Sequence, residues 1–278
     1  MKRGFFLFMM MAAVASMGQT NTGGRVKVVQ CWDDSLTTDI PLVALLKKHR
    51  AKATFNIIPR ETPRDSFVVK KMKAGKHVLF SFLKKEDSRA GGFTVGHLIN
   101  SEMPAIYKGF KIAAHCGIPL GDTLKDSEVR MRTLLKTKAL IRDGFAQPVC
   151  GYVYPGGGFS PAAMTDIKKA GYLYARTTKS ARAPLPLDEP MALPASCHWA
   201  ASDFWERYEE AKKSGGIFYF WGHSCELGDD PELWAWLGSI FERISADPEA
   251  EWADVIDLFS EKDGGSTAGS IQSLERTE

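Results

Sequence analysis

Short β-rich runs alternate with helical patterns along most of this chain, and this alternation constrains the fold more than any other feature. Strand, helix and strand in succession are typical of βαβ units, whose strands lie parallel in one sheet. The runs that read as strands are Val26–Trp32, Ala53–Ile58, Val78–Phe82, Phe110–Ala114, Val149–Tyr154, Tyr172–Arg176 and Ile217–Trp221. The helical patterns are Ile40–Lys48, Ser66–Ala74, Val95–Tyr107, Ser127–Arg142, Pro161–Ala170, Ser202–Lys213 and Pro231–Ile244.

The repeated strand–helix unit predicts an α/β fold, namely a distorted, closed or nearly closed β/α barrel of about seven strands. An open doubly wound sheet is the alternative that the same alternation allows. No boundary interrupts the pattern, so residues 25–261 are predicted to form one domain. In either architecture, the chemistry is expected at the carboxyl ends of the strands. Several helical patterns are followed by a glycine suited to a left-handed helix end, namely Gly75, Gly109, Gly144, Gly171 and Gly215.

The beginning of the chain reads as an export signal. Lys2 and Arg3 precede an uncharged, mostly apolar stretch from Gly4 to Met17, and small residues follow it. That stretch is shorter than the ~20 residues that a bilayer span needs. The sequence therefore predicts a signal peptide at residues 1–18, a linker at residues 19–24 and a soluble exported protein, periplasmic or extracellular, with no membrane partner after cleavage. The Gly/Ser/Thr-rich residues 262–278 are predicted to be a disordered tail.

The charge of the chain bears on its possible partners, and its cysteine content bears on possible disulfides. The formal net charge is +3 and no run of five like charges occurs, so nucleic acid is not an expected partner. The chain has five cysteines, an odd number, and their spacing shows no disulfide framework. We therefore expect them to be small buried side chains. They are Cys31, Cys116, Cys150, Cys197 and Cys225.

Side chains that can carry chemistry recur where the predicted strands end. Asp33 and Asp34 follow the first strand, His115 follows the fourth, and His223 follows the last. The run Tyr154-Pro155-Gly156-Gly157-Gly158 forms a turn after the fifth strand and exposes backbone N–H groups there. Each feature alone has a structural explanation, such as a helix cap for an aspartate or a buried core position for a histidine. Together, at one edge of a parallel sheet, they indicate a site.

The order of these motifs resembles that of the polysaccharide deacetylase family, the carbohydrate esterases related to chitin and peptidoglycan deacetylases. Residues 32–35, Trp-Asp-Asp-Ser, are similar to its Thr-Phe-Asp-Asp-Gly motif, and residues 52–55, Lys-Ala-Thr-Phe, to its Ala-Thr-Phe-Phe motif. Residues 111–115 resemble the segment that leads into its His-Ser/Thr-x-x-His metal motif. Residues 154–157 are similar to its oxyanion loop, and residues 221–223, Trp-Gly-His, to its late Leu-x-His motif.

The resemblance implies roles for five of these residues. Asp33 would be the general base and His223 the general acid. Asp34 and His115 would bind a divalent metal ion, zinc, whose bound water becomes a hydroxide near neutral pH. The N–H of Gly156 would stabilise the oxyanion of the tetrahedral intermediate.

Further residues are expected to contact the substrate. Arg176 has two explanations, because an arginine at a strand end can orient a substrate or an acid, or can form a structural ion pair. The expected substrate-binding residues are Trp32, Tyr154, Pro155, Arg176 and Trp221. His198 can line the same cleft but has no evident partner, and His97 reads as the start of a helix.

Three positions depart from the family pattern. Pro119 stands where the family has its second metal-binding histidine, so the metal is expected to be held weakly, with Asp122, another loop or solvent as the replacement. The usual arginine of the third motif falls near Val153, so its contribution is expected to be missing. Ser35 replaces the glycine that follows the two aspartates.

The prediction for function is metal-dependent hydrolysis of N- or O-acetyl groups on a carbohydrate polymer, with an acetylated polysaccharide or oligosaccharide as the partner. The first alternative is a catalytically inactive, carbohydrate-binding relative that has lost its metal at Pro119. The second is a barrel glycosidase with paired carboxylates. Two adjacent aspartates on one strand fit that mechanism poorly, because its carboxylates face each other across the scissile bond.

Overall fold

The computed structural model describes residues 25–74, 77–83, 92–116, 126–182 and 185–259. The expected signal peptide, linker and tail, and also Pro119 and Asp122, lie outside these described residues. No helix among the described residues is long and apolar enough to cross a bilayer.

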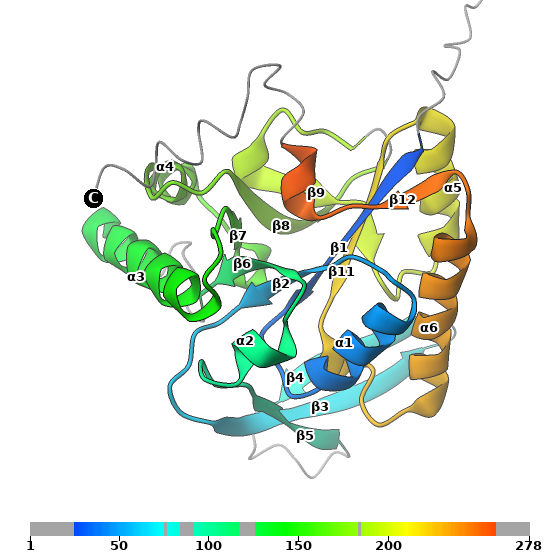
Figure 1. Ribbon diagram of the computed structural model, residues 1–278, viewed down its shortest axis with the longest axis horizontal. Helices are drawn as coiled ribbons and strands as arrows, with labels where there is room; N and C mark the ends of the chain where they lie inside the picture. The colour runs from blue at the N-terminus through cyan, green and yellow to red at the C-terminus, as the bar shows by residue number, and fades with distance from the viewer. Residues whose placement is uncertain (1–24, 75–76, 84–91, 117–125, 183–184, 260–278) are drawn as a thin grey trace, which may run out of the picture.

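One large parallel sheet forms the centre of the molecule (Figure 1). Its path runs β10-β11-β1-β2-β6-β7-β8-β9, and β12 pairs with β1 outside that path. The strands are β1 (Val26–Asp33), β2 (Thr54–Ile57), β6 (Lys111–His115), β7 (Gly151–Val153), β8 (Tyr174–Ser180), β9 (Leu193–Ala195), β10 (Cys197–His198), β11 (Ile217–Gly222) and β12 (Ala250–Trp252).

The sheet curves into a nearly closed barrel, as the sequence predicts. The two ends of its path are consecutive segments of chain, because β9 pairs with β8 and β10 pairs with β11. Between them, the N–H of Ser196 donates to the carbonyl of Tyr219 on β11. These two short strands were not predicted: they carry too few residues to show a period, and Pro194 disfavours a strand.

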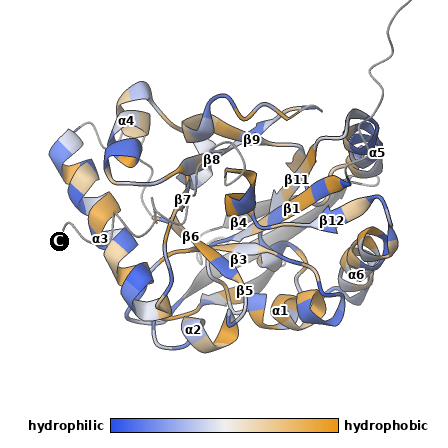
Figure 2. Cartoon of the chain, turned by 45° about the horizontal axis from the view of Figure 1, so that its top comes forward, coloured by the Kyte–Doolittle hydropathy of each residue, from blue (hydrophilic) through white to orange (hydrophobic). Residues whose placement is uncertain are grey.

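Helices surround this sheet, with both apolar and polar residues on each of them (Figure 2). α6 shows why: Leu237, Ile240, Phe241 and Ile244 recur at helical spacing and are buried in the core. Asp230 caps its first turn ahead of Pro231. The helices are α1 (Asp39–Lys48), α2 (Met103–Ile106), α3 (Ser127–Phe145), α4 (Pro161–Lys169), α5 (Phe204–Ser214) and α6 (Pro231–Ala246).

The segment after β2 differs from the prediction. β3 (Arg64–Ala74), β4 (His77–Leu83) and β5 (Gly92–His97) form a separate antiparallel sheet in the order β4-β3-β5. The predicted helix at residues 66–74 is therefore wrong, and the predicted strand at residues 78–82 does not belong to the barrel. The predicted helix at residues 95–107 is a strand end followed by the short α2. β3 pairs with a strand on each side, and this pairing outweighs a helix-like spacing that is only local.

Glycines end helices at two of the five predicted positions, Gly171 after α4 and Gly215 after α5, and both have positive φ angles. Gly109 also has a positive φ, but it lies beyond Tyr107, the residue that caps the end of α2. Gly144 instead lies inside α3, which ends at Ala146 in the left-handed conformation. Gly75 lies outside the described residues. None of the five cysteines forms a disulfide, and four of them are buried, as expected.

Candidate active site

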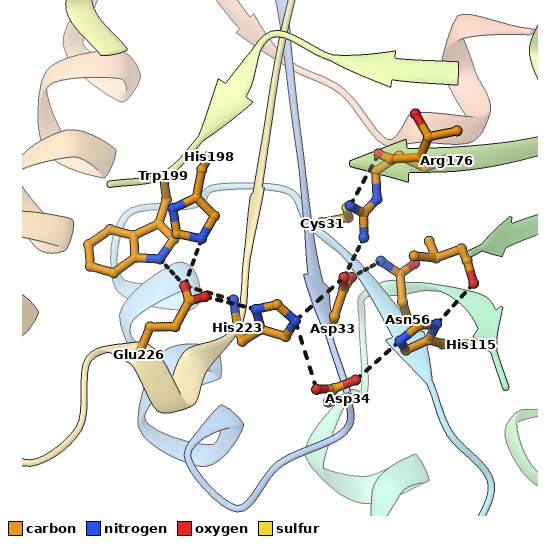
Figure 3. Close-up of polar contacts among 12 residues, drawn as sticks. Cys31, Asp33, Asp34, Asn56, His115, Arg176, His198, Trp199, His223 and Glu226 are labelled. Carbon is orange, nitrogen blue, oxygen red and sulfur yellow. Dashed lines mark hydrogen bonds and ion pairs between the residues drawn. The ribbon is translucent and has the colours of Figure 1, made fainter. Parts of the chain in front are cut away.

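Four predicted residues come together at the carboxyl ends of three parallel strands (Figure 3). Asp33 ends β1 and Asp34 follows it, His115 ends β6, and His223 follows β11. β1 pairs with β11 and with β2, and β2 pairs with β6, so all these strands end at the same rim of the barrel. The parallel order of the strands therefore produces the cluster, as the sequence argument predicts.

Asp33 is buried and tightly held. Its Oδ1 accepts a hydrogen bond from Asn56 Nδ2 at 2.6 Å, and its Oδ2 forms an ion pair with the Arg176 guanidinium. Burial alone would raise the pKa of Asp33, but the charges of Arg176, His115 and His223 together outweigh burial and hold the pKa below its usual range. Asp33 is therefore a carboxylate at neutral pH, in a fixed orientation.

Arg176 corrects two predictions. It lies on β8 directly opposite Val153 of β7, so a guanidinium reaches Asp33 from the neighbouring strand, and the arginine contribution expected to be missing near Val153 is present. Arg176 has no exposed surface, and its guanidinium packs 4.6 Å from the ring centre of Trp221. Arg176 therefore holds an acid, Asp33, through a buried ion pair, and it offers no surface to a substrate.

Asp34 and His115 face each other beside this pair. Asp34 Oδ1 lies 3.1 Å from His115 Nε2, and His115 Nδ1 lies 2.9 Å from the carbonyl oxygen of Val153. A carbonyl only accepts, so Nδ1 carries a hydrogen and Nε2 is left to face the carboxylate. Burial would lower the pKa of His115, but the hydrogen bond and charge of Asp34, together with the charge of Asp33, outweigh burial and raise it. Burial likewise opposes the charge of Asp34, but the hydrogen bond from His115 and the charge of His223 hold the pKa of Asp34 below its usual range.

The backbone at this position is strained. Asp34 and Ser35 have φ angles of 82° and 55°, in the region that favours glycine. A non-glycine residue there costs of the order of 1 kcal/mol or more and persists where its surroundings hold it. The Ser35 hydroxyl accepts the N–H of Ile58 at 3.0 Å, which fixes the turn without a glycine.

A cation suits the gap between His115 Nε2 and Asp34 Oδ1. A neutral imidazole that donates through Nδ1 to a backbone carbonyl presents its Nε2 lone pair to the carboxylate, and this contact needs a proton or a metal ion between the two groups. The donor set is one carboxylate and one imidazole, which zinc accepts. No third His, Cys, Asp or Glu joins this pair as a compact set of ligands within the part of the chain that the structure describes. The residues thus fit a metal ion with two protein ligands.

His223 points its ring toward both aspartates. Its Nε2 lies 3.9 Å from Asp33 Oδ2 and 3.8 Å from Asp34 Oδ2. Its Nδ1 hydrogen-bonds to Glu226 Oε1 at 2.8 Å. Burial would lower the pKa of His223, but the charge of Glu226, its hydrogen bond and the two aspartates raise it to about 10. His223 is therefore a protonated imidazolium at neutral pH, with its Nε2–H directed into the site.

Glu226 is the functional residue that the sequence argument missed. It is buried, and its Oε2 accepts hydrogen bonds from the His198 ring at 2.8 Å and from the indole N–H of Trp199. Burial would raise the pKa of Glu226, but His198 and His223 outweigh burial and lower it. The signal was present, because a residue three positions after His223 returns to the same side in a 3₁₀ turn (Ser224–Glu226).

His198 therefore has a partner, contrary to expectation. Its Nδ1 accepts the backbone N–H of Ala200 at 3.2 Å, so the Nε2 that faces Glu226 carries a hydrogen. Trp199 packs so closely that a Cβ at Gly222 would lie 2.1 Å from its Cδ1. The glycine before His223 is thus required by the side chain that binds Glu226.

Of the remaining residues predicted for the site, two are buried and three have exposed surface. Trp32 and Tyr154 are buried, and they donate to Gln30 Oε1 at 2.9 Å and to the Met191 carbonyl at 2.8 Å, so neither presents a surface to a substrate, contrary to expectation. Pro155 and Trp221 are partly exposed. Gly156 is exposed in a 3₁₀ turn (Pro155–Gly157) with a φ of 64°. Because β7 pairs with β6, this turn follows the strand beside His115.

Comparisons by sequence and by structure give different results. No known family model and no curated protein matches the chain by sequence. By structure, it is similar to a protein described as a polysaccharide deacetylase from Mycobacterium smegmatis, with 13% identity, a TM-score of 0.58 and coverage of 86% of this chain and 90% of the other. It is also similar to the 4-alpha-glucanotransferase from Thermococcus litoralis, with 10% identity and a TM-score of 0.54, over 86% of this chain but only 40% of that enzyme.

Other matching structures come from the same group of deacetylases. The deacetylase PplD from Streptococcus pyogenes is 18% identical with a TM-score of 0.42, and the match covers 59% of this chain and 61% of PplD. Further matches are CE4 esterases, among them a CE4 pseudoenzyme. At such identities the likeness concerns architecture, and one architecture carries different reactions. The chain has the fold of the polysaccharide deacetylases.

Proposed function

We propose that this protein is a carbohydrate deacetylase that hydrolyses N- or O-acetyl groups on a polysaccharide or oligosaccharide. The observation that carries the proposal is the pairing of Asp33 with His223 across the site, their reactive atoms 3.9 Å apart. Their neighbours push the two pKa values apart, so that one side chain is a base and the other an acid at the same pH. Such a divergence in one site is the mark of assigned acid and base roles.

Asp34 and His115 are the residues that would hold a divalent cation, of the zinc class. Bound there, the cation would act as a Lewis acid and lower the pKa of a coordinated water. With only two protein ligands among the described residues, we expect the cation to be bound weakly.

The chain's own groups supply the proton transfers. Asp33, oriented by Arg176 and Asn56, accepts a proton from the attacking water. The backbone N–H of Gly156 stabilises the negative charge that develops on the acetyl oxygen. The Nε2–H of His223 then protonates the leaving amine or alcohol, and Glu226 holds the ring and its positive charge during this step.

Trp221 and Pro155 are the predicted binding residues with surface to offer a sugar. Trp221 is partly exposed beside His223, with ring centres 5.7 Å apart, and an aromatic face suits a pyranose ring. An acetylated polymer outside the cytoplasm is the partner that we propose. The proposed export rests on the N-terminal pattern of Lys2, Arg3 and the apolar stretch after them.

The test is release of acetate from acetylated chitooligosaccharides, acetylxylan and peptidoglycan fragments, with added zinc or cobalt and with a chelator. We expect acetate from at least one substrate, loss of activity with chelator, and loss in Asp33→Asn. Asp143→Asn is the matched control, because Asp143 is an exposed carboxylate on α3, away from the site. Glycan binding without acetate release under every metal condition would overturn the proposal in favour of the inactive, carbohydrate-binding alternative.

A further inference from the structure

A pocket opens at the end of the barrel opposite the candidate active site. It has a volume of about 340 Å³ and lies where the last turn of α1, the start of β2 and the turn before β6 meet. Lys52 lies just before β2 and Lys108 just before β6, whereas His115 ends β6. Since β2 and β6 are parallel, the pocket lies at their amino ends and the candidate active site at their carboxyl ends. The two sites are therefore separate.

The pocket is strongly basic. Its lining includes Lys47, Arg50, Lys52 and Lys108, against one acidic residue, Asp254. Of these cations, Lys52 forms an ion pair with Asp257, which lies outside the pocket lining, at 3.7 Å. Within the part of the chain that the structure describes, the other three have no carboxylate within 4 Å. Three positive charges that no carboxylate of the described residues pairs with thus share one concave surface.

Asp254 does not neutralise these three charges. It is buried, and its carboxylate accepts a backbone N–H in a capping box with Asp257. Lys52 and Lys111 are the cations that act on it electrostatically. The positive electrostatic potential in the pocket therefore comes mainly from Lys47, Arg50 and Lys108.

The end of α1 does not account for this cluster. Basic residues often compensate the carbonyls at a helix end. Here the carbonyls of Leu45, Leu46 and Lys47 already accept backbone N–H groups from the residues that follow the helix. Lys108 comes from another segment, in the turn after α2.

We propose that this pocket binds a phosphate group. A phosphate dianion balances several cations at once, and the planar fork of an arginine matches two of its oxygens. A single carboxylate would leave most of the positive charge unbalanced. The volume exceeds that of one phosphate, and the Phe110 ring, with Lys47 Nζ 5.8 Å from its centre, provides an apolar wall for the group that carries the phosphate. The ligand class is therefore a phosphate monoester, for which inorganic phosphate is the simplest probe.

The test is calorimetric titration of the full chain with inorganic phosphate, with glucose 6-phosphate and with glucose. Arg50→Gly combined with Lys108→Ala removes two of these three cations. Arg50 has a φ of 53°, which glycine adopts readily, so the fold is expected to persist. The matched control combines Lys168→Ala with Lys169→Ala, two exposed lysines at the end of α4.

We expect one saturable site for phosphate, weakened at least about tenfold in the pocket variant and unchanged in the control. Tighter binding of glucose 6-phosphate than of phosphate would identify a sugar phosphate as the ligand, and equal binding the free anion. Acetate release is expected to be unchanged in the pocket variant, because the active site lies at the other end of the barrel. Absence of saturable binding of both phosphate compounds, or equal weakening in both variants, would overturn the proposal.

Discussion

The two halves of the candidate active site differ in how completely their side chains are held. In the proton-transfer half, Asp33 is held by Asn56 and Arg176, and His223 by Glu226 (Figure 3). In the proposed metal half, Asp34 and His115 have each other, the Val153 carbonyl and the nearby His223 ring. The first half is organised before any ligand arrives, whereas we propose that a cation completes the second. Variants in the first half should therefore cost most.

The largest effect is expected from Arg176→Met. It leaves the buried carboxylate of Asp33 without its guanidinium, and breaking a buried ion pair in this way costs about 3–5 kcal/mol of stability. Combining it with Asp33→Asn removes the uncompensated charge, so most stability should return while acetate release stays absent. Denaturant unfolding and acetate release measure the two properties.

Arg142→Met is the control for this comparison, because Arg142 forms an exposed pair with Asp143. We expect it to cost less than about 1 kcal/mol. If Arg176→Met alone is as stable as the double variant, the Arg176–Asp33 pair does not organise the site.

The second-largest effect is expected from Glu226→Gln, which weakens proton donation by His223. Loss of the carboxylate lowers the pKa of His223 from about 10, because that charge is the main influence that raises it. The alkaline limb of the profile of kcat/KM against pH should move to lower pH, and kcat should fall by about 10²-fold at neutral pH. Glu232→Gln on the exposed start of α6 is the control, and an unmoved alkaline limb would contradict the role of Glu226.

The raised pKa of His223 also makes the stability of the fold depend on pH. The folded-state pKa of His223 lies above its unfolded value of 6.5. The contribution to stability is therefore full below about pH 6.5 and is lost as the pH rises toward about 10. Glu226→Gln should reduce this dependence, which unfolding measured across that range would detect.

Whether a feature could be predicted from the sequence depends on how far apart in the chain the interacting residues lie. The positions of Asp33, Asp34, His115 and His223 are consequences of parallel strands, because all such strands end at one rim. The partner of Arg176 was not predicted, because its contact with Asp33 links residues 143 positions apart and depends on the closure of the barrel. His198 meets Glu226 only because β10 pairs with β11, and β10 has two residues.

The prediction for β3 was wrong for the opposite reason. Its local pattern was clear enough to be read as a helix, but its pairing with β4 and β5 decides its structure. A single-sequence pattern carries no information on such partners. Errors therefore concentrate where the conformation is set by contacts between distant segments.

The third-largest effect is expected in the proposed metal half of the site. Asp34→Asn removes one of two proposed protein ligands, so zinc affinity should fall by about 10–100-fold or more, together with activity. Asp33→Asn should keep zinc and lose turnover, because Asp33 is held by Arg176 rather than facing His115. Calorimetric titration of the metal-free protein measures both. Equal loss of zinc in the two variants would show that the roles of the aspartates are shared or reversed.

The smallest effect is expected at His198, which acts on the reaction only through Glu226. Its ring donates one of several hydrogen bonds to that carboxylate, and Trp199 and the backbone N–H of His223 would remain. Loss of one such bond costs about 0.5–1.5 kcal/mol, so His198→Ala should lower kcat by about tenfold or less and leave KM unchanged. His198→Gln, which retains an N–H donor, should recover part of the loss. If His198→Ala is as damaging as Glu226→Gln, then His198 is required for proton transfer itself, and the proton-transfer half extends one residue further than the contacts around His223 indicate.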